Sequence, residues 1–139
     1  MSDRKNLFEK KTFTMHSGDV GRWKIECDAL TDKDIDTLAF IIASQVTFRR
    51  VIGVATGGLR IAKSLEKYKS ENGWCLIVDD VLTTGNSMEE VRNKYVEDVD
   101  NIMGVVLFAR SQCPSWVIPL FQMSKFFGKT GGKRTCMRI

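Results

Sequence analysis

The most informative stretch of the sequence is Cys75-Leu76-Ile77-Val78-Asp79-Asp80-Val81-Leu82-Thr83-Thr84-Gly85-Asn86-Ser87. Its apolar start predicts a short strand that is buried on both faces. Two adjacent carboxylates follow where we expect the strand to end and water to begin. Hydroxyl residues around a glycine then open a helix, which is how a loop presents backbone N–H groups and the positive end of a helix dipole to a phosphate.

Two interpretations of this stretch stand side by side. Carboxylates bind hydroxyls and cations, so Asp79 and Asp80 beside a phosphate-binding loop indicate a phosphorylated sugar. The acids would then hold the ring hydroxyls, and Thr83 to Ser87 would hold the terminal phosphate. In the simpler interpretation the acids are solvated loop residues and Thr83 to Ser87 only caps a helix.

The sequence on either side alternates between strand and helix patterns. Buried strands are expected over the following ranges: 51–55, 75–78, 102–108 and 116–122. Between them, helical spacing begins at Leu59 and again at Met88. Continuous apolar strands separated by helices predict an α/β fold with an open, mainly parallel, doubly wound sheet flanked by helices. Ligands bind such sheets beyond the carboxyl ends of the strands, where Thr56-Gly57-Gly58, the two acids and Arg110 all lie.

Before this core the pattern is different. Trp23 to Asp28 alternates with period two, and Thr12 to Met15 is expected to pair with it across a turn at Ser17 to Asp19. Thr31 is a predicted N-cap for a helix that carries Ile35, Leu38, Ala39 and Ile42 on one face. We therefore divide a single domain, residues 1–139, into a small N-terminal hood hairpin (10–30), an α/β core (31–123) and a basic tail (124–139).

Composition narrows the class of protein. The chain has 139 residues, 43% hydrophobic and 27% charged, which is typical of one globular domain. No apolar run approaches the roughly 18 residues of a membrane span, and the charged N-terminus lacks a secretory signal. We therefore expect a cytoplasmic protein without a membrane partner.

The cysteine and histidine content limits the chemistry. The 4 cysteines form no Cys-x-x-Cys pair, and His16 is the only histidine, so an ordinary zinc site is close to excluded. Reduced thiols are the expected state. The net charge of +4 reflects a basic C-terminal stretch, which is either a solvated tail or a contact for an anionic ligand or nucleic acid.

The stretch from Cys75 to Ser87 also resembles the phosphoribosyl pyrophosphate signature of the type I phosphoribosyltransferases: apolar run, Asp-Asp, two aliphatics, Thr-Thr-Gly-x-Ser. The resemblance implies that Asp79 and Asp80 meet the ribose hydroxyls and, largely through water, Mg²⁺. It also implies a set of residues around the ribose and the 5-phosphate: Asp79, Asp80, Val81, Thr83, Thr84, Gly85, Asn86 and Ser87.

A second loop, Gly53 to Gly58, is similar to the pyrophosphate loop of that family in position and in its paired glycines. The resemblance implies pyrophosphate contacts from these residues: Ala55, Thr56, Gly57, Gly58 and Arg60. Glycine permits close approach to a polyanion and unusual dihedral angles, although such a pair also simply tightens many strand-to-helix turns.

Two further stretches resemble the orotate branch of the family. Phe13-Thr14-Met15-His16-Ser17-Gly18 is similar to the start of the hood that covers the base, and Arg110 lies where that branch places an arginine on the orotate carboxylate. The resemblance thus implies base contacts from Phe13, Ser17 and Arg110. From the residues alone, Arg110 is equally a surface residue at a strand end, and His16 an ordinary turn residue.

The sequence departs from the family pattern in one respect. Related enzymes insert another strand and a long mobile loop with a catalytic lysine or arginine before the Asp-Asp strand, and no room for this insertion exists between Leu59 and Cys75. Without this loop, the chain lacks the cation that neutralises the negative charge of the leaving pyrophosphate in related enzymes. Arg60 and the basic tail are candidates for compensation, within one chain or across a homodimer.

The leading hypothesis is a phosphoribosyltransferase of pyrimidine nucleotide biosynthesis, a pentosyl-transferring glycosyltransferase. It would move the phosphoribosyl group of phosphoribosyl pyrophosphate to a nucleobase, orotate or a related base, with Asp79, Asp80 and Arg60 as catalytic residues and Mg²⁺ as cofactor. The alternative is a binding module that senses phosphoribosyl pyrophosphate or a nucleotide and contacts nucleic acid through its tail.

Overall fold

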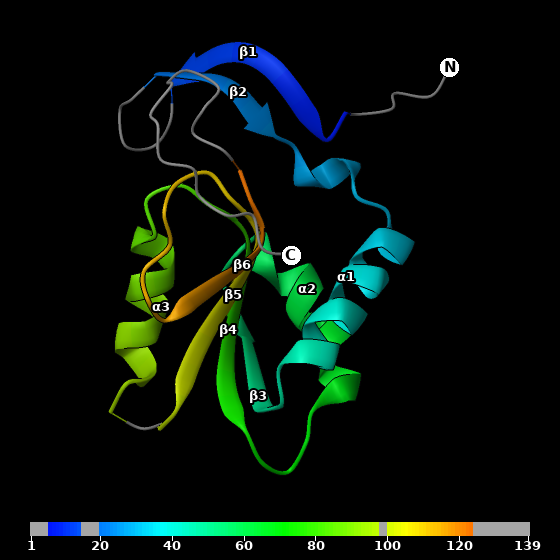
Figure 1. Cartoon of the computed structure of the whole chain (residues 1–139), viewed down its shortest axis with the longest axis vertical. Coiled ribbons are helices and arrows are strands. Elements are labelled where there is room, and N and C mark those ends of the chain that lie inside the picture. Colours follow the sequence, from blue (N-terminus) through cyan, green and yellow to red (C-terminus); the bar gives the residue numbers. More distant parts are fainter. Residues whose placement is uncertain (1–5, 15–19, 98–99, 124–139) are drawn as a thin grey trace.

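A parallel four-stranded sheet forms the centre of the computed structural model, which describes residues 6–14, 20–97 and 100–123 (Figure 1). The strands are β3 (Phe48–Gly53), β4 (Trp74–Leu82), β5 (Ile102–Ala109) and β6 (Val117–Gln122). They lie in the order β3-β4-β5-β6, and each neighbouring pair is parallel. The predicted parallel α/β sheet is therefore confirmed.

Helices cover both faces of the sheet. On one face lie α1 (Asp32–Gln45) and α2 (Gly58–Leu65), the latter continuing into the short 3₁₀ helix η2 (Glu66–Tyr68); on the other lies α3 (Asn86–Tyr95). The two faces hold separate apolar clusters. The α1 and α2 cluster includes Ile42, Leu65 and Leu76, and the α3 cluster includes Ile77 and Met88.

The predicted start of α1 is confirmed in atomic detail. The Thr31 hydroxyl accepts the N–H of Asp34 at 3.1 Å, and the Asp34 carboxylate accepts the N–H of Thr31 at 2.8 Å. This reciprocal pair is a capping box, and it satisfies two N–H groups that a helix start otherwise leaves without partners. The residues expected on the inner face, Ile35 to Ile42 at helical spacing, are buried against the sheet.

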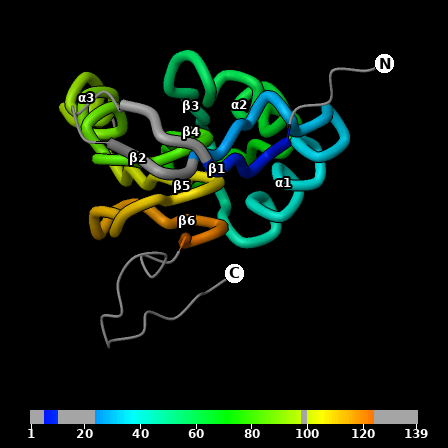
Figure 2. The backbone as a smooth tube through the Cα atoms, turned by 90° about the horizontal axis from the view of Figure 1, so that it is seen from above, coloured from blue at the N-terminus to red at the C-terminus, as the bar shows by residue number. Residues whose placement is uncertain are grey.

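The two connections that contain α2 and α3 have opposite hands. Both step the same way across the sheet, from β3 to β4 and from β4 to β5, yet their helices lie on opposite faces. Figure 2 looks down on the carboxyl ends of the strands and shows α2 on the side that makes the β3-α2-β4 connection left-handed. Only about 2% of parallel crossovers have this hand.

The hood is a two-stranded antiparallel hairpin above the carboxyl ends of the sheet strands (Figure 1). It consists of β1 (Phe8–Thr14) and β2 (Val20–Ile25), followed by the 3₁₀ helix η1 (Cys27–Ala29). The predicted hairpin is confirmed, but its predicted register was wrong: the segment from Trp23 to Ile25 pairs with residues 8–10, and Phe13 and Thr14 pair with residues 21 and 20. The second strand ends at Ile25 and does not reach Asp28. The predicted turn at Ser17 to Asp19 lies outside the described residues.

The prediction for the end of the central strand was wrong. β4 does not stop at Val78 but continues through both acids to Leu82. The reason is long-range pairing, because Asp79 is in register with Val106 of β5 and Val81 with Phe108. The acids are therefore held by the sheet and not by a turn.

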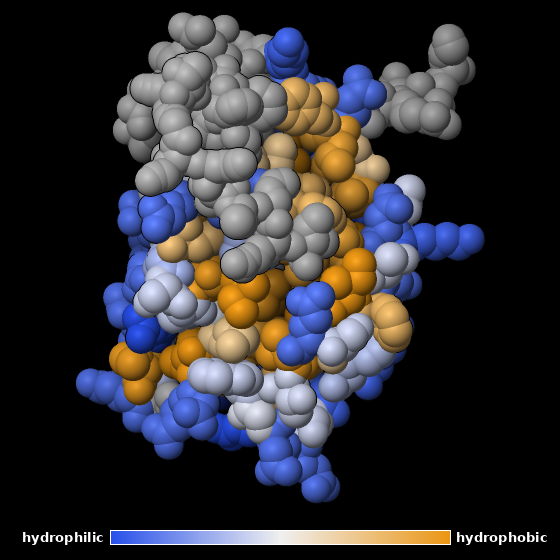
Figure 3. Space-filling model, viewed as in Figure 1, coloured by the Kyte–Doolittle hydropathy of each residue, from blue (hydrophilic) through white to orange (hydrophobic). Residues whose placement is uncertain are grey.

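The surface combines apolar and charged regions. Figure 3 shows apolar side chains across the middle of the face on which β6 lies in front, with hydrophilic residues around its lower end. Ile118 of β6 and Phe40 of α1 are exposed at 43% and 59%. Among the described residues, no helix is long and apolar enough to cross a bilayer.

Candidate functional site

The two acids lie on neighbouring positions of β4 and differ in environment. Asp79 is buried, with only 9% of its surface exposed, whereas Asp80 is half-buried. Each carboxylate accepts the N–H of the next residue: Asp79 Oδ1 from Asp80 at 2.8 Å, and Asp80 Oδ1 from Val81 at 2.7 Å. The expectation that both acids are freely accessible was therefore wrong for Asp79, because the strand that carries it runs inside the sheet.

Burial changes the protonation of Asp79. The pKa of this carboxyl group is raised from 3.8 to about 7, mainly by loss of hydration on burial and second by the negative charge of Asp80. The hydrogen bond from the Asp80 N–H acts in the opposite direction but is weaker. Near neutral pH the carboxyl group of Asp79 is therefore partly protonated, whereas a fully solvated aspartate would be ionised.

The glycine loop after β3 packs directly on the acid pair. Val54 donates its N–H to the carbonyl of Val78 at 2.9 Å, and Gly58 donates to Val54 at 2.8 Å, so the loop turns back beside β4. A side-chain carbon on Gly57 would overlap the carboxylate of Asp80. The backbone of Gly57 has ordinary helical angles, φ −60° and ψ −32°, so glycine is required here for space and not for its dihedral freedom.

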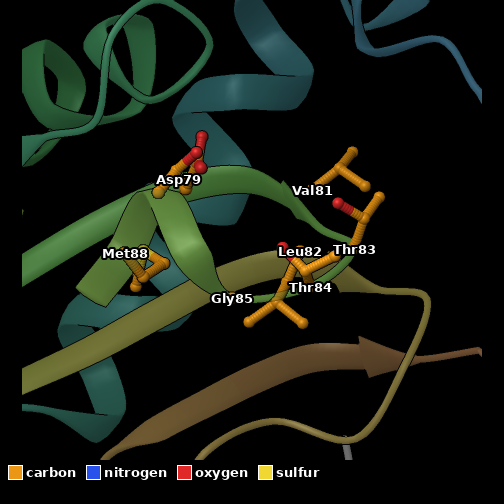
Figure 4. A pocket seen from close by; sticks show the side chains of 8 residues that line it. Asp79, Val81, Leu82, Thr83, Thr84, Gly85 and Met88 are labelled. Atoms are coloured by element: carbon orange, nitrogen blue, oxygen red, sulfur yellow. The ribbon is translucent and has the colours of Figure 1, made fainter. Parts of the chain in front are cut away.

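The loop after β4 surrounds a small hollow of about 30 Å³ (Figure 4). Its lining is as follows: Asp79, Val81, Leu82, Thr83, Thr84, Gly85, Ser87 and Met88. Gly85 has a φ of 89°, a left-handed conformation that favours glycine, and it immediately precedes α3. The N–H of Asn86 is taken by Thr84 Oγ1 at 3.2 Å, and no side chain caps α3. The first-turn N–H groups at Ser87 and Met88 thus face a loop of hydroxyls, an arrangement suited to an anion.

Arg110 borders this loop from the end of β5. Its N–H donates to the carbonyl of Leu82 at 2.8 Å, and the next residue, Ser111, donates its hydroxyl to the carbonyl of Thr83. Arg110 is half-buried, and burial lowers the pKa of its guanidinium. Sequence analysis did not identify Ser111, although its position directly after Arg110 was a usable signal.

Arg60 points to a different part of the molecule. One guanidinium nitrogen, Nη2, donates to the carbonyl of Leu30 at 3.0 Å and lies 3.3 Å from Asp32 Oδ1. These contacts tie α2 to the chain just before α1. The expected role of Arg60 at the pyrophosphate and in catalysis stays a prediction, and it requires the guanidinium to leave these partners.

The base of the hood brings a thiol to the site. The pKa of Cys27 is raised to about 12, mainly by burial and then by the negative charges of Asp80, Glu26, Asp79 and Asp28, in that order. The effect of Asp80 places the Cys27 thiol within electrostatic reach of the acid pair. No sequence motif marks Cys27, so only the folded chain identifies it as a neighbour of the site.

Two predicted base contacts are tested only in part. Phe13 lies in β1 and is in register with Gly21 of β2, so its backbone belongs to the hood as expected. Ser17, like His16, lies outside the described residues.

Of the expected pyrophosphate residues, Ala55 and Thr56 are exposed and joined by a cis peptide bond.

The side chains of the site could bind a magnesium ion only together with water and the phosphate oxygens of a bound substrate. No group of three or more His, Cys, Asp or Glu side chains gathers in the described part of the chain, so Asp79 and Asp80 stand alone as acidic donors. Magnesium characteristically binds to one or two carboxylates and completes its shell with water and substrate phosphates. Two carboxylates beside a loop that offers donors to an anion have the composition of such a site.

Comparisons with known proteins support the fold. No protein-family model and no curated protein sequence matches the chain. Among solved structures, orotate phosphoribosyltransferase from Aeropyrum pernix is 19% identical, covers 84% of this chain and 88% of its own, and superposes with a TM-score of 0.69.

Two further structures extend this result. The orotate enzyme from Francisella tularensis is 20% identical over 79% of this chain and 70% of its own, with a TM-score of 0.54. A purine phosphoribosyltransferase from Pyrococcus horikoshii is 22% identical over 67% of this chain and 82% of its own, with a TM-score of 0.50. The chain therefore has the fold of the type I phosphoribosyltransferases.

Proposed function

We propose that the protein is a phosphoribosyltransferase that transfers the phosphoribosyl group of phosphoribosyl pyrophosphate to a nucleobase, with orotate or a related pyrimidine base as acceptor. The observation that carries the proposal is the contact between the Gly57 backbone and the Asp80 carboxylate. The glycine loop proposed for the pyrophosphate thus packs on the acid pair, and the loop proposed for the 5-phosphate, Thr83 to Ser87, directly follows the same strand. A sugar that carries phosphate at both ends requires such an arrangement.

The reaction forms a bond between a base nitrogen and the anomeric carbon of the ribose, while the bond from that carbon to pyrophosphate breaks and its electron pair leaves with the pyrophosphate. Positive charge develops on the ribose in the transition state. Catalysis therefore depends on fixing both phosphate ends and on keeping water away from the anomeric carbon. Magnesium, when bound, neutralises charge on the departing pyrophosphate.

The residues of this chain have separate proposed tasks. Asp79 and Asp80 accept hydrogen bonds from the ribose hydroxyls, and the loop from Thr83 to Ser87 holds the 5-phosphate. Ala55 to Gly58 offers backbone N–H groups to the pyrophosphate. The Arg110 guanidinium is a fork of donors suited to a carboxylate on the base, and the Arg110 main chain is bound to Leu82 beside the loop. Phe13 and Ser17 are the other proposed base contacts.

We also propose that the enzyme acts as a homodimer in the cytoplasm. The apolar surface around β6, where Ile118 is exposed, supports association with a second copy (Figure 3). The three cysteines in the described part of the chain, Cys27, Cys75 and Cys113, are all free thiols, as a reducing compartment favours.

The position of Arg60 favours a second candidate function. Its guanidinium is bound to the Leu30 carbonyl and to Asp32, so these partners already use its donors. Without a cation at the pyrophosphate, the same site would bind phosphoribosyl pyrophosphate or a nucleotide but would not turn it over. In that case the protein is a sensor, and its basic tail is the part suited to nucleic acid.

One experiment separates these functions. The protein is incubated with phosphoribosyl pyrophosphate, Mg²⁺ and one of a panel of free bases (orotate, uracil, adenine, guanine, hypoxanthine), and pyrophosphate release is measured. The enzyme predicts release with orotate or a related base and its loss in Asp80→Asn. The exposed Asp36 of α1 provides the matched control, because Asp36→Asn makes the same chemical change away from the site.

Binding measured by calorimetry completes the test. Binding without release for every base favours the sensor. No binding of phosphoribosyl pyrophosphate to the folded wild-type protein contradicts both functions.

A further inference from the structure

The outer edge of β3 is open. Strand β3 pairs with β4 only, and no other strand in the described part of the chain lies beside it. In a parallel ladder, alternate residues direct their N–H and C=O groups to opposite neighbours. Val54 donates to the Val78 carbonyl of β4, so Ile52 also faces β4, while the main-chain groups of Val51 and Gly53 face outward. Such a row of unpaired groups is a template for another strand.

A groove of about 290 Å³ runs along this edge on the α3 side. Its floor comes from β3 and its end, and its wall from α3, as follows: Ile52, Gly53, Val54, Ala55, Ser87, Glu90, Val91, Lys94 and Tyr95. Because α3 runs antiparallel to the strands, Ala55 and Ser87 lie at the site end of the groove, and Lys94 and Tyr95 at the other. An added strand would thus lie in a prepared channel, with alternate side chains directed toward α3.

The charges at the far end of the groove indicate what kind of strand fits. The Arg50 guanidinium stacks on the Tyr95 ring at 5.0 Å from its centroid, and Lys94, the residue before Tyr95, is exposed. No carboxylate of the described residues forms an ion pair with Arg50 or Lys94. The only acid in the lining is Glu90. The groove is therefore mainly apolar along its middle, where Glu90 is the one charged residue, and basic at its far end.

We propose that the β3 edge and this groove bind an extended, acidic segment of a partner polypeptide by strand addition. Backbone hydrogen bonds to Val51 and Gly53 supply the attachment, alternate apolar side chains fill the groove, and acidic side chains meet Arg50 and Lys94. A second copy of this chain is the poorer fit, because antiparallel pairing of β3 with itself brings Arg49 and Arg50 of both copies into one short ladder, where like charges repel. The inference does not depend on the proposed enzymatic function.

The test uses a defined probe, the labelled peptide acetyl-Asp-Glu-Thr-Val-Thr-Val-Thr-amide, with the full-length protein and fluorescence anisotropy at about 0.15 M salt, where screening extends over about 8 Å. We expect saturable binding. Arg50→Glu and Lys94→Glu should each weaken it at least about tenfold, since each replaces a charge-assisted contact by repulsion. Lys33→Glu is the matched control, because Lys33 is equally exposed but lies on α1, on the opposite side of the sheet from the groove, so affinity should change by at most about threefold.

A second measurement identifies strand addition itself. Amide hydrogen exchange followed by NMR should slow at least about tenfold at Val51 and Gly53 when the peptide saturates, and should stay unchanged at Ile52, whose N–H already faces β4. A peptide with alternate amide nitrogens methylated should not bind, because it cannot form the edge hydrogen bonds.

Four results would each overturn the proposal. The first three are no saturable binding of the probe, equal binding of the methylated peptide, and equal losses in Lys33→Glu and Arg50→Glu. The fourth is a dimer of the free chain in which the Val51 and Gly53 amides are already protected. The last result would assign the edge to a second copy. Circular dichroism of each variant confirms that these exposed substitutions leave the fold intact.

Discussion

Replacing Asp79 by asparagine should remove a penalty on stability that depends on pH. The pKa of this carboxyl group is about 7 in the folded chain and 3.8 when solvated, because burial and the charge of Asp80 disfavour its ionised form. At a pH between these two pKa values, Asp79 is protonated in the folded state and ionised in the unfolded state. The free energy of unfolding of the wild type therefore falls as the pH rises from about 4 to about 7, and the loss is complete above the folded pKa.

The size of this effect follows from the two pKa values. One pH unit corresponds to about 1.4 kcal/mol, so the interval from 3.8 to about 7 amounts to at most about 4 kcal/mol. Asparagine carries no charge, and its amide oxygen can still accept the Asp80 N–H. The variant should therefore gain up to about 4 kcal/mol relative to the wild type between pH 4 and pH 8.

Urea unfolding followed by circular dichroism at pH 4, 6 and 8 measures the effect directly. Asp36→Asn, on the exposed side of α1, controls for the loss of an acid without burial. Asp80→Asn should retain most of the pH dependence, because burial is the largest cause of the raised pKa and Asp80 only the second. The reasoning is refuted if Asp79→Asn and Asp36→Asn show the same stability difference from the wild type at all three pH values.

Three further predictions concern neighbouring contacts. Gly57→Ala places a carbon where the Asp80 carboxylate lies, so the carboxylate must turn away. We expect the free energy of unfolding in urea to fall by about 1 kcal/mol and the calorimetric affinity for phosphoribosyl pyrophosphate with Mg²⁺ to fall at least about tenfold. An unchanged affinity would contradict this placement. Arg60→Ala should lower the free energy of unfolding by about 0.5–1.5 kcal/mol through loss of the hydrogen bond to the Leu30 carbonyl; an unchanged affinity for phosphoribosyl pyrophosphate would contradict the role that the sequence predicts for Arg60, and a selective loss of affinity would support it. Thr31→Ala should lower the free energy of unfolding by about 1 kcal/mol through loss of the capping box, and Thr31→Ser, which keeps the hydroxyl group, should not.

Local signals predicted much of the fold. The α1 start was found from Thr31 because a capping box is formed by residues three positions apart, and no distant contact is required. The strands of the sheet were found because each is a run of apolar residues long enough to be buried on both faces. The end of β4 was missed for the opposite reason. Asp79 is polar, and only its pairing with Val106 of β5 keeps it inside a strand.

The site was predictable as a set of segments but not as a geometry. The order of loops and acids along the chain identified Gly57, Asp80 and Gly85 as neighbours at one end of the sheet. The sequence did not show that Gly57 is needed for space beside Asp80, while Gly85 is needed for its positive φ. Nor did it show that Arg60 reaches α1, because its partner, the Leu30 carbonyl, is a backbone group without any sequence signal.

The left-handed connection through α2 offers a way to enlarge the sheet by protein engineering. From the face on which α2 lies, a connection of the common right-handed type leads outward past β3 and away from β4. The turn between η2 and β4, with Glu71 and Asn72 exposed, is thus a natural insertion point for a grafted antiparallel hairpin. Its first strand would lie along β3, and its second would return the chain to the start of β4, so the sheet would widen without rethreading the core.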